Sequence, residues 1–455
     1  MSRCVLASSL LLAACVAVPA QTYRVIYNFG SDSETYLGPS LDASISQGRD
    51  GAIYSTGTLN SQTKTDGAFR IGPLGSFHTL HQWTGGGKPY SGLDLATDDK
   101  YYGINEVGGT DKLGTVFRMT ASGGVSTLYN FPGGSGGAFG MSVMQSMEGD
   151  FYVSTSGGSD SGDDHGSILR MTKDGNVTLL HAFTGSDGTG PMVLVQGADF
   201  RFYGVTARGG SGNGGTIFRI SSTGDFEVLY NFNANGAFPE AGLIQANDGN
   251  FYGTTSEGGS SNHGVLFRIT PGGAYTVLHN FSGKADGGAP AGRLVQATDG
   301  NLYGANVFGG AEFNGVLYGA TLAGAVVAIH NFSATDGVDA QAELMQHTNG
   351  RIYGSTSSGG EFNHGVFYSL DAGLAPFVTY LPVYGRAGAE VQILGQGFSD
   401  ASRVSFNGIA CNSVTVVSST FLEAIVPAGA TSGKITVTTS NGTLMSNKVF
   451  VVHAN

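Results

Sequence analysis

Residues 242–281 read GLIQANDGNFYGTTSEGGSSNHGVLFRITPGGAYTVLHNF, and this stretch decides the fold class. It contains four short runs that are rich in β-branched and aromatic side chains. Asn, Asp, Gly and Pro residues separate the runs, and these residue types favour turns. The stretch therefore predicts four short antiparallel strands, joined by two tight turns and one longer Gly-rich loop.

The same unit recurs along the chain with a nearly constant period. A tyrosine after the turn between the first two runs marks each copy, and successive marks lie 48 to 51 residues apart. The marks are Tyr54, Tyr102, Tyr152, Tyr203, Tyr252, Tyr303 and Tyr353. Four strands in about 50 residues is the size of one propeller blade, so the sequence predicts an all-β fold with a seven-bladed β-propeller. An open solenoid is the alternative, but it needs polar capping units that the sequence lacks.

The two ends of the array predict how it closes. The fourth run of a unit carries a Leu or Ile, then Tyr or His, and an aromatic residue two positions later. This pattern already appears at Ile26–Phe29, before the first complete unit, whereas the seventh unit ends at Leu370 without it. We expect the strand at 23–29 to complete the last blade from outside, because pairing removes an exposed sheet edge.

The N-terminus and the composition predict an exported protein that does not bind nucleic acid. Residues 1–20 have one early positive charge, an apolar stretch and small residues before a cleavage point between Ala20 and Gln21, as in a secretory signal. The stretch ending at Cys15 also resembles a lipobox, so a lipid-anchored form is the alternative to a secreted or cell-surface form. The formal net charge of −12, with no basic stripe, disfavours contact with phosphate backbones.

Motifs that recur in register connect the repeats to a known family. The elements F-Y-G-T-T, G-G, G-x-x-F-R-I and L-H-N-F, spread over about residues 23–371, resemble the bacterial GloVer tandem-repeat family. That resemblance implies an exported protein and brings no established reaction or catalytic residues with it.

A second domain follows the repeats. We expect the repeat domain to span 21–371, a Gly/Pro/Ala linker 372–376, and a small domain 377–455. The motifs G-Q-G-F, V-S-F-N-G, V-P-A-G and I-T-V-T-T-S-N-G of the small domain are similar to those of IPT/TIG domains. The resemblance implies an immunoglobulin-like β-sandwich that serves as a spacer or a binding module.

The long, variable loops of a propeller emerge on one face, and we expect any ligand to bind there. A flat aromatic ring covers the apolar face of a sugar while carboxylates accept its hydroxyl groups. The candidate ligand-binding residues are Tyr36, Tyr90, Phe139, Phe238, Phe313, Phe362, Glu240 and Glu312. The alternative is that each ring packs beneath its own loop.

No strong metal or cofactor motif accompanies these residues. Asp160, Asp163 and Asp164 offer oxygen ligands for Ca²⁺ but lack EF-hand spacing, so we predict neither a metal site nor a cofactor. His165, His263 and His364 share one repeat position, which spreads them apart and favours loop-capping roles. The sequence thus favours a monomeric, non-catalytic binding or scaffold protein that engages glycan or protein. The alternative is an extracellular polysaccharide-acting enzyme that uses loop carboxylates as acid and base.

Overall fold

The computed structural model describes residues 21–30, 44–60, 65–84, 87–134, 137–157, 165–400 and 402–453. The predicted features at Cys15, Ala20, Tyr36, Asp160, Asp163 and Asp164 lie outside these ranges. The described residues form a series of antiparallel β-sheets, so the all-β prediction is confirmed. Within the described ranges, no helix is long and apolar enough to cross a membrane.

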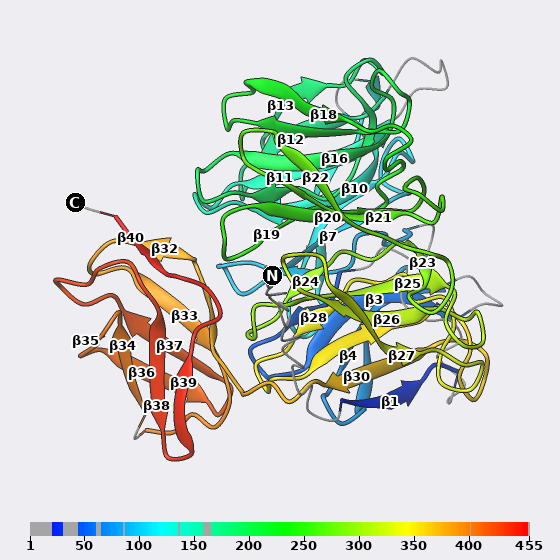
Figure 1. Cartoon of the computed structure of the whole chain (residues 1–455). Helices are drawn as coiled ribbons and strands as arrows, with labels where there is room; N and C mark the ends of the chain where they lie inside the picture. The colour runs from blue at the N-terminus through cyan, green and yellow to red at the C-terminus, as the bar shows by residue number, and fades with distance from the viewer. Residues whose placement is uncertain are drawn as a thin grey trace, which may run out of the picture.

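The first four repeats each form one antiparallel sheet (Figure 1). The first sheet consists of β2 (Ser46–Gln47), β3 (Ile53–Asn60), β4 (Thr65–Ile71) and β5 (Phe77–Gln82). The second consists of β6 (Asp94–Leu95), β7 (Tyr101–Asn105), β8 (Thr115–Met119) and β9 (Val125–Asn130). The third consists of β10 (Ala138–Gln145), β11 (Phe151–Gly157), β12 (Ser167–Met171) and β13 (Val177–Ala182). The fourth consists of β14 (Thr189–Pro191), β15 (Val195–Gln196), β16 (Phe202–Arg208), β17 (Thr216–Ile220) and β18 (Phe226–Asn231).

The last three repeats continue the pattern, and the seventh recruits a strand from the start of the chain. The fifth sheet consists of β19 (Ile244–Gln245), β20 (Phe251–Thr255), β21 (Val265–Ile269) and β22 (Tyr275–Asn280). The sixth consists of β23 (Gly288–Pro290), β24 (Val295–Gln296), β25 (Leu302–Phe308), β26 (Val316–Ala320) and β27 (Val326–Asn331). The seventh consists of β28 (Met345–Gln346), β29 (Ile352–Ser355), β30 (Val366–Asp371) and, as its outer strand, β1 (Thr22–Asn28).

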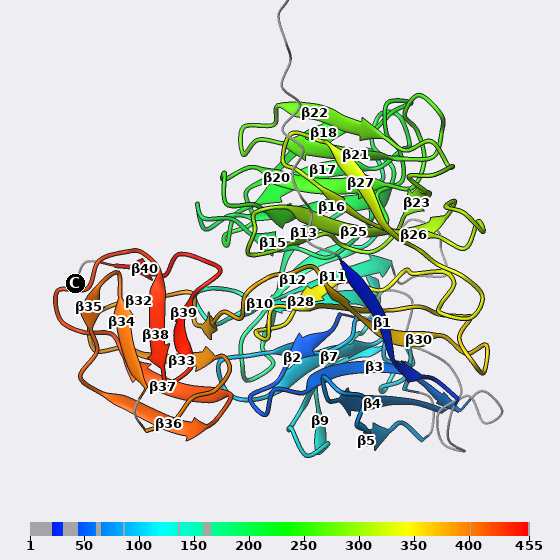
Figure 2. The ribbon, with the colours of Figure 1, turned by 60° about the horizontal axis from the view of Figure 1, so that its bottom comes forward.

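The predicted pairing of the N-terminal strand with the last repeat is confirmed. β1 runs antiparallel to β30, from Thr22 opposite Asp371 to Asn28 opposite Val366, and Figure 2 shows the two strands side by side. Its side chains also reach both adjacent sheets. The Tyr23 ring stacks on His330 of β27 with centroids 3.8 Å apart, and the Tyr27 ring stacks on Phe77 of β5 at 4.9 Å. β1 therefore joins the sixth, seventh and first sheets.

The tyrosines that mark the repeats hold each sheet to the next one. The hydroxyl of Tyr252 donates to Asp248, four residues earlier in the turn, at 2.8 Å, and the hydroxyl of Tyr203 donates to Asp199 in the same way. The ring of Tyr203 stacks on Phe251 of the following sheet, with centroids 4.0 Å apart. One residue thus buries an aromatic ring between sheets while its polar end closes the turn, which explains why a tyrosine stands at this repeat position.

Glutamines at the ends of the first strands form a second set of links between sheets. The side-chain oxygen of each accepts a backbone N–H from the turn of the preceding sheet at 2.6 to 2.9 Å. These residues are Gln47, Gln145, Gln196, Gln245, Gln296 and Gln346. Gln47 of the first sheet bonds to Thr348 of the seventh, so the first and last sheets are direct neighbours.

The second sheet carries Leu95 at the glutamine position and is joined to the first sheet differently. Arg49 of the first sheet forms an ion pair with Asp99 in the turn of the second. The backbone N–H of Ser44 also donates to the carbonyl oxygen of Ser91 at 3.1 Å. Each sheet is therefore bonded to both of its neighbours.

The C-terminal domain is a two-sheet β-sandwich, which confirms the immunoglobulin-like prediction. One sheet consists of β31 (Thr379–Leu381), β33 (Glu390–Leu394), β37 (Phe421–Ile425) and β36 (Val414–Ser418). The other consists of β35 (Ile409–Ala410), β34 (Arg403–Phe406), β38 (Ile435–Thr439) and β39 (Gly442–Met445), and β32 (Tyr384–Gly385) pairs with β40 (Val451–Val452). Buried residues from both sheets, among them Ile393 and Phe406, form one core between them.

A pair of glycines in the fifth repeat gives the first prediction. Gly264 and Gly249 both have positive φ, at +87° and +82°. A Cβ on Gly264 would overlap the carbonyl oxygen of Thr255, whereas a Cβ on Gly249 would meet no atom within 4 Å. We expect Gly249→Ala to lower the free energy of unfolding by about 1 kcal/mol, from backbone strain alone, and Gly264→Ala by about 2 kcal/mol. Equal losses of unfolding free energy in the two variants, measured by urea unfolding, would mean that the overlap with the Thr255 carbonyl oxygen does not contribute.

Candidate functional site

A cavity lies where first strands of the sheets face the C-terminal domain. Its volume is about 470 Å³, within the range of small-molecule sites. The first strands β2, β6, β10, β15 and β28 line one side, and Pro382 and Lys448 of the C-terminal domain line the other. We call this space the central cavity. Because five of the first strands line it, their repeats contribute equivalent positions to its wall.

Charged residues occupy a few of these equivalent positions. Arg293 and Glu343 stand just before the first strands of the sixth and seventh sheets, and their side chains form an ion pair at 3.0 Å. At the matching position the other repeats carry only Ser, Gly or Val: Ser44, Gly92, Ser142, Val193 and Gly242. Asp94 of β6 occupies a neighbouring position, where the other repeats carry Ser46, Met144, Val195, Ile244, Val295 and Met345. Asp94 and Arg293 line the cavity and Glu343 pairs with Arg293 beside it, so the site gathers charges that the repeat does not require.

The environment of Asp94 changes its protonation. Burial raises the pKa of the Asp94 carboxyl to about 7, and the nearby Glu343 carboxylate acts in the same direction. Arg293 and a hydrogen bond from Ser46 oppose this rise without cancelling it. At pH 6 the carboxyl is therefore mostly neutral, and the charge of the cavity changes near neutral pH.

Asp94→Asn tests this assignment through the pH dependence of stability. The pKa of Asp94 is higher in the folded state than in the unfolded state. Ionisation of Asp94 therefore lowers the free energy of unfolding as pH rises from about 4 through 7. Asn stays neutral, so we expect the variant to match the wild type near pH 4 and to exceed it by roughly 2 kcal/mol at pH 8. Urea unfolding at both pH values measures the difference. A difference that does not change with pH would show that Asp94 titrates normally.

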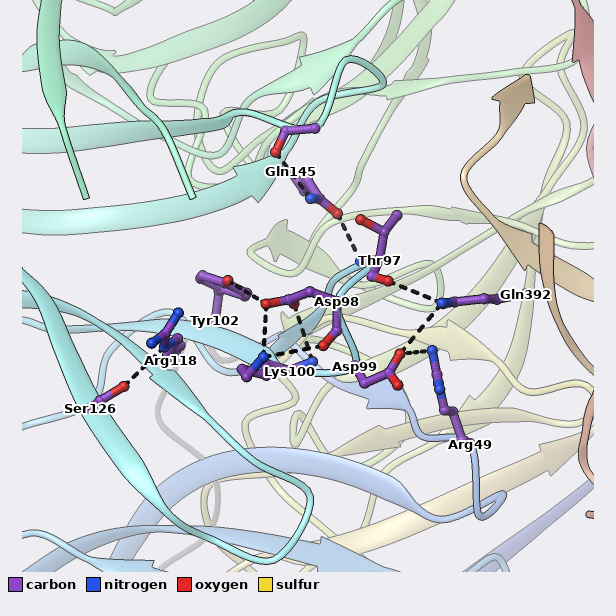
Figure 3. A network of polar contacts seen from close by, with 11 residues as sticks. Arg49, Thr97, Asp98, Asp99, Lys100, Tyr102, Arg118, Ser126, Gln145 and Gln392 are labelled. Atoms are coloured by element: carbon purple, nitrogen blue, oxygen red, sulfur yellow. Dashed lines mark hydrogen bonds and ion pairs between the residues drawn. The ribbon is translucent and has the colours of Figure 1, made fainter. Parts of the chain in front are cut away.

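The C-terminal domain covers one side of the repeat array. We call this side the turn face, because it carries the turns between the first and second strands of each sheet. Gln392 Nε2 donates to the carbonyl oxygen of Thr97 at 3.0 Å, and Thr97 N–H in turn donates to Gln145 Oε1 at 2.9 Å (Figure 3). The Arg49 guanidinium pairs with Asp99 and lies over the Phe421 ring, 4.1 Å from its centroid.

Further contacts reach the fourth and seventh sheets. Gln396 Nε2 donates to Thr348 Oγ1 at 2.9 Å, and the Phe200 ring contacts Tyr384 and His453 edge-on or tilted. In the described part of the chain, the hydrogen bonds and ring contacts between the two domains all run through these turns and the segment after Asp371. The opposite side, which we call the long-loop face, carries the loops between the second and third strands and between sheets.

The structure divides the predicted ligand-binding residues into two groups. Phe313 and Phe362 are 70% and 41% exposed on the long-loop face, and Glu312 is exposed beside Phe313. Tyr90 and Phe139 are half-buried, and Phe238 lies under the Arg208 guanidinium, 4.9 Å from its ring centroid. Glu240 is exposed and accepts a hydrogen bond from Ser256 at 3.1 Å. Gln21 directly precedes β1.

The charged residues of the central cavity were not among the residues predicted from the sequence. Asp94, Arg293, Glu343 and Lys448 lie far apart in the chain and meet only in the folded protein. A signal was nevertheless present, because three of them replace small or apolar residues at fixed repeat positions. Within the described ranges, no three His, Cys, Asp or Glu side chains lie close enough together to hold a metal ion.

Solved structures with a similar fold come from proteins of different kinds. A fungal alcohol oxidase of the AA5 family, in complex with copper, has a TM-score of 0.52 and 14% identity, over 94% of this chain and 100% of its own. PorZ, a surface component of the type-IX secretion system of Porphyromonas gingivalis, has a TM-score of 0.49 and 11% identity. That alignment covers 91% of this chain, which spans 59% of the PorZ chain. At 14% identity, the similarity to the alcohol oxidase is a likeness of fold alone.

Sequence families identify both parts of the chain. No curated protein matches the sequence. The IPT/TIG domain family matches residues 377–452. The Gloeobacter/Verrucomicrobia repeat matches residues 122–297 and 272–394, which together exceed half of the chain. With its tyrosine-marked sheets and its C-terminal IPT/TIG domain, the chain belongs to the Gloeobacter/Verrucomicrobia repeat family.

Proposed function

We propose that this protein is an exported, non-catalytic binding or scaffold protein, and that its seven sheets close into a seven-bladed β-propeller. Three observations support closure. Gln47 bonds the first sheet to the seventh, β1 contacts the sheets on both sides of its own, and first strands from around the array line one cavity. The signal-like residues 1–20 support export, either with release after Ala20 or with a lipid anchor on Cys15.

The long-loop face is the binding surface in this proposal. The contacts of the C-terminal domain fall on the turn face, which leaves the longer and more variable loops available to a partner. Exposed aromatic rings beside carboxylates suit a sugar, because a ring covers its apolar face while oxygens accept its hydroxyl groups. The net charge of −12 disfavours acidic polymers, so we expect a neutral glycan. A cell-surface protein is the alternative partner.

Phe313 is the observation that carries the proposal. It is 70% exposed and has φ of +59°, a conformation that is unfavourable for a bulky side chain. The equivalent residues in other repeats are Asn213, Asn262 and Asn363, which tolerate this conformation, and Lys112, which like Phe313 has positive φ without being asparagine. Each asparagine also accepts a hydrogen bond from a glycine N–H in its own loop at 3.0 to 3.3 Å. Phenylalanine loses this bond and keeps the strain, as expected for a residue retained for binding.

Phe313→Asn is expected to separate stability from binding. Restoring the residue of the sister repeats should raise the free energy of unfolding by about 0.5–1 kcal/mol, because the strain falls and the hydrogen bond returns. The same substitution should weaken binding to neutral glycans at least tenfold, a loss of about 1.4 kcal/mol of binding free energy. A glycan array, followed by calorimetry on the strongest neutral ligand, measures the second effect.

Asn262→Gln serves as the matched control, since it alters the same loop position in the fifth repeat without touching an exposed ring. It should lower stability slightly and leave binding unchanged. Retention of a protein but of no glycan would transfer the role to the alternative partner. Unchanged binding of every ligand by Phe313→Asn would remove the basis for the long-loop site.

A further inference from the structure

The central cavity contains polar groups that the protein itself does not satisfy. Lys448 lines the cavity just before β40. Among the described residues, no hydrogen bond or ion pair engages its ammonium group. The neighbouring Asn447 also lines the cavity, and within the same described residues its buried Oδ1 has no hydrogen-bond partner. A cation and an acceptor therefore face the same space without partners.

The surrounding charges leave a single positive charge in excess. Glu343 neutralises Arg293 through their ion pair, Asp99 neutralises Arg49 in the same way, and Asp94 is mostly neutral below pH 7. Burial of the cavity, followed by repulsion from Arg293, lowers the pKa of the Lys448 ammonium. An anion between these two cations relieves that repulsion. Because the excess is one charge, and because Glu343 repels further negative charge, the site favours a monoanion over a dianion.

The size and the lining of the cavity narrow the choice of ligand further. A volume of about 470 Å³ exceeds the needs of an inorganic ion and suits a molecule with roughly ten or more non-hydrogen atoms. Met144, Val195 and Met345 give one part of the wall an apolar surface. Asn447 Oδ1 calls for a hydrogen-bond donor, such as a hydroxyl group. A carboxylate, a hydroxyl group and a partly apolar ring are combined in a sugar acid.

We propose that the central cavity binds a small hydroxylated carboxylate of sugar-acid size, held between the repeat domain and the C-terminal domain. The carboxylate contacts Lys448 and lies near Arg293, and a hydroxyl group donates to Asn447 Oδ1. The charged residues of the sixth and seventh repeats thus acquire a role that repeat packing does not give them. This site is separate from the long-loop face, and Phe313→Asn leaves its binding unchanged.

Isothermal titration calorimetry on the mature full chain at pH 6 tests the proposal, with D-glucuronate and D-galacturonate as probes. Methyl β-D-glucoside is the neutral comparison, and inorganic sulfate, which is a dianion at pH 6, is the comparison for charge. We expect at least one uronate to bind with Kd below about 1 mM and the glucoside not to bind. Raising the pH to 8 ionises Asp94 and should weaken uronate binding at least threefold. Failure of both uronates to bind, or tighter binding of sulfate, overturns the proposal.

Two lysine variants locate the site. Lys448→Met keeps the alkyl chain and removes the charge, and it should weaken uronate binding at least tenfold. Lys284→Met makes the same charge change at an exposed position on the long-loop face and should leave binding unchanged. A thermal melt of each variant confirms that it is folded, and a uronate-induced rise in the wild-type melting temperature gives a second readout. Equal loss of uronate binding in both variants, or no loss in Lys448→Met, would mean that the uronate binds elsewhere and would refute the central cavity as its site.

Discussion

Deletion of residues 21–30 is expected to abolish cooperative unfolding of the repeat domain or to lower its melting temperature by more than 10 °C. The segment contains β1, the outer strand of the seventh sheet, and the buried residue Phe29. Tyr23, Val25, Tyr27 and Phe29 pack against buried residues of neighbouring sheets. Burying side chains of this size contributes about 1.5–3 kcal/mol each, so their loss approaches the whole stability of a typical domain. Circular dichroism during heating measures the effect.

Adding the missing strand in trans provides the control. A synthetic peptide of residues 21–30 should bind the open edge of β30 and recover part of the lost stability, whereas a scrambled peptide of the same composition should not. Tyr23→Ala gives a graded version and is expected to cost about 3 kcal/mol, because it removes the ring stacked on His330. If the truncated protein unfolds at the wild-type temperature, β1 does not hold the first and last repeats together.

Thr348→Val is expected to lower the free energy of unfolding by about 3 kcal/mol. The Thr348 hydroxyl is fully buried and accepts hydrogen bonds from Gln47 Nε2 at 2.8 Å and from Gln396 Nε2 at 2.9 Å. Those two amides belong to the first sheet and to the C-terminal domain. Valine has nearly the same shape but accepts no hydrogen bond, so the buried Gln47 donor and the part-buried Gln396 donor lose their partner, at about 1–3 kcal/mol for a fully buried donor and less for the other. Urea unfolding of the full chain gives the value.

The sixth repeat offers a matched control for this substitution. Thr298 Oγ1 accepts the same kind of bond, from Gln346 Nε2 at 2.9 Å, but Thr298 is exposed to water. Thr298→Val should therefore cost less than about 0.5 kcal/mol, because water replaces the lost acceptor. Similar losses of stability for the two variants would mean that burying Thr348 between the first sheet, the seventh sheet and the C-terminal domain adds nothing to stability.

The repeat domain was predictable because its signals are local and occur seven times. The position of a tyrosine four residues after a turn aspartate is predictable, because its hydroxyl bonds to that aspartate and its ring packs on the next repeat. The N-terminal strand was predictable for the same reason: Ile26–Phe29 carries a pattern that the seventh repeat lacks. Because the repeats are periodic, this contact between distant parts of the chain could be predicted by comparing the first and last repeats.

The central cavity was not predictable in the same way. Asp94, Arg293, Glu343 and Lys448 come from three repeats and a different domain, and nothing local fixes their distances. The position of the C-terminal domain on the turn face was also hidden, because it depends on single side chains such as Gln392 and Arg49. The exposure of Phe313 was anticipated, but its strained backbone became visible only in the structure.

The pairing of Thr22 with Asp371 also fixes an order of events during folding. β1 is synthesised first, yet its partner β30 leaves the ribosome last among the strands of the repeat domain. Contacts between such distant residues form slowly, since a long loop must close before any of its interactions is gained. Until then the edge of β30 is open to strands of other molecules. Nascent chains of this protein therefore pass through an interval of exposure to aggregation, which ends only when the two extremities of the repeat array meet.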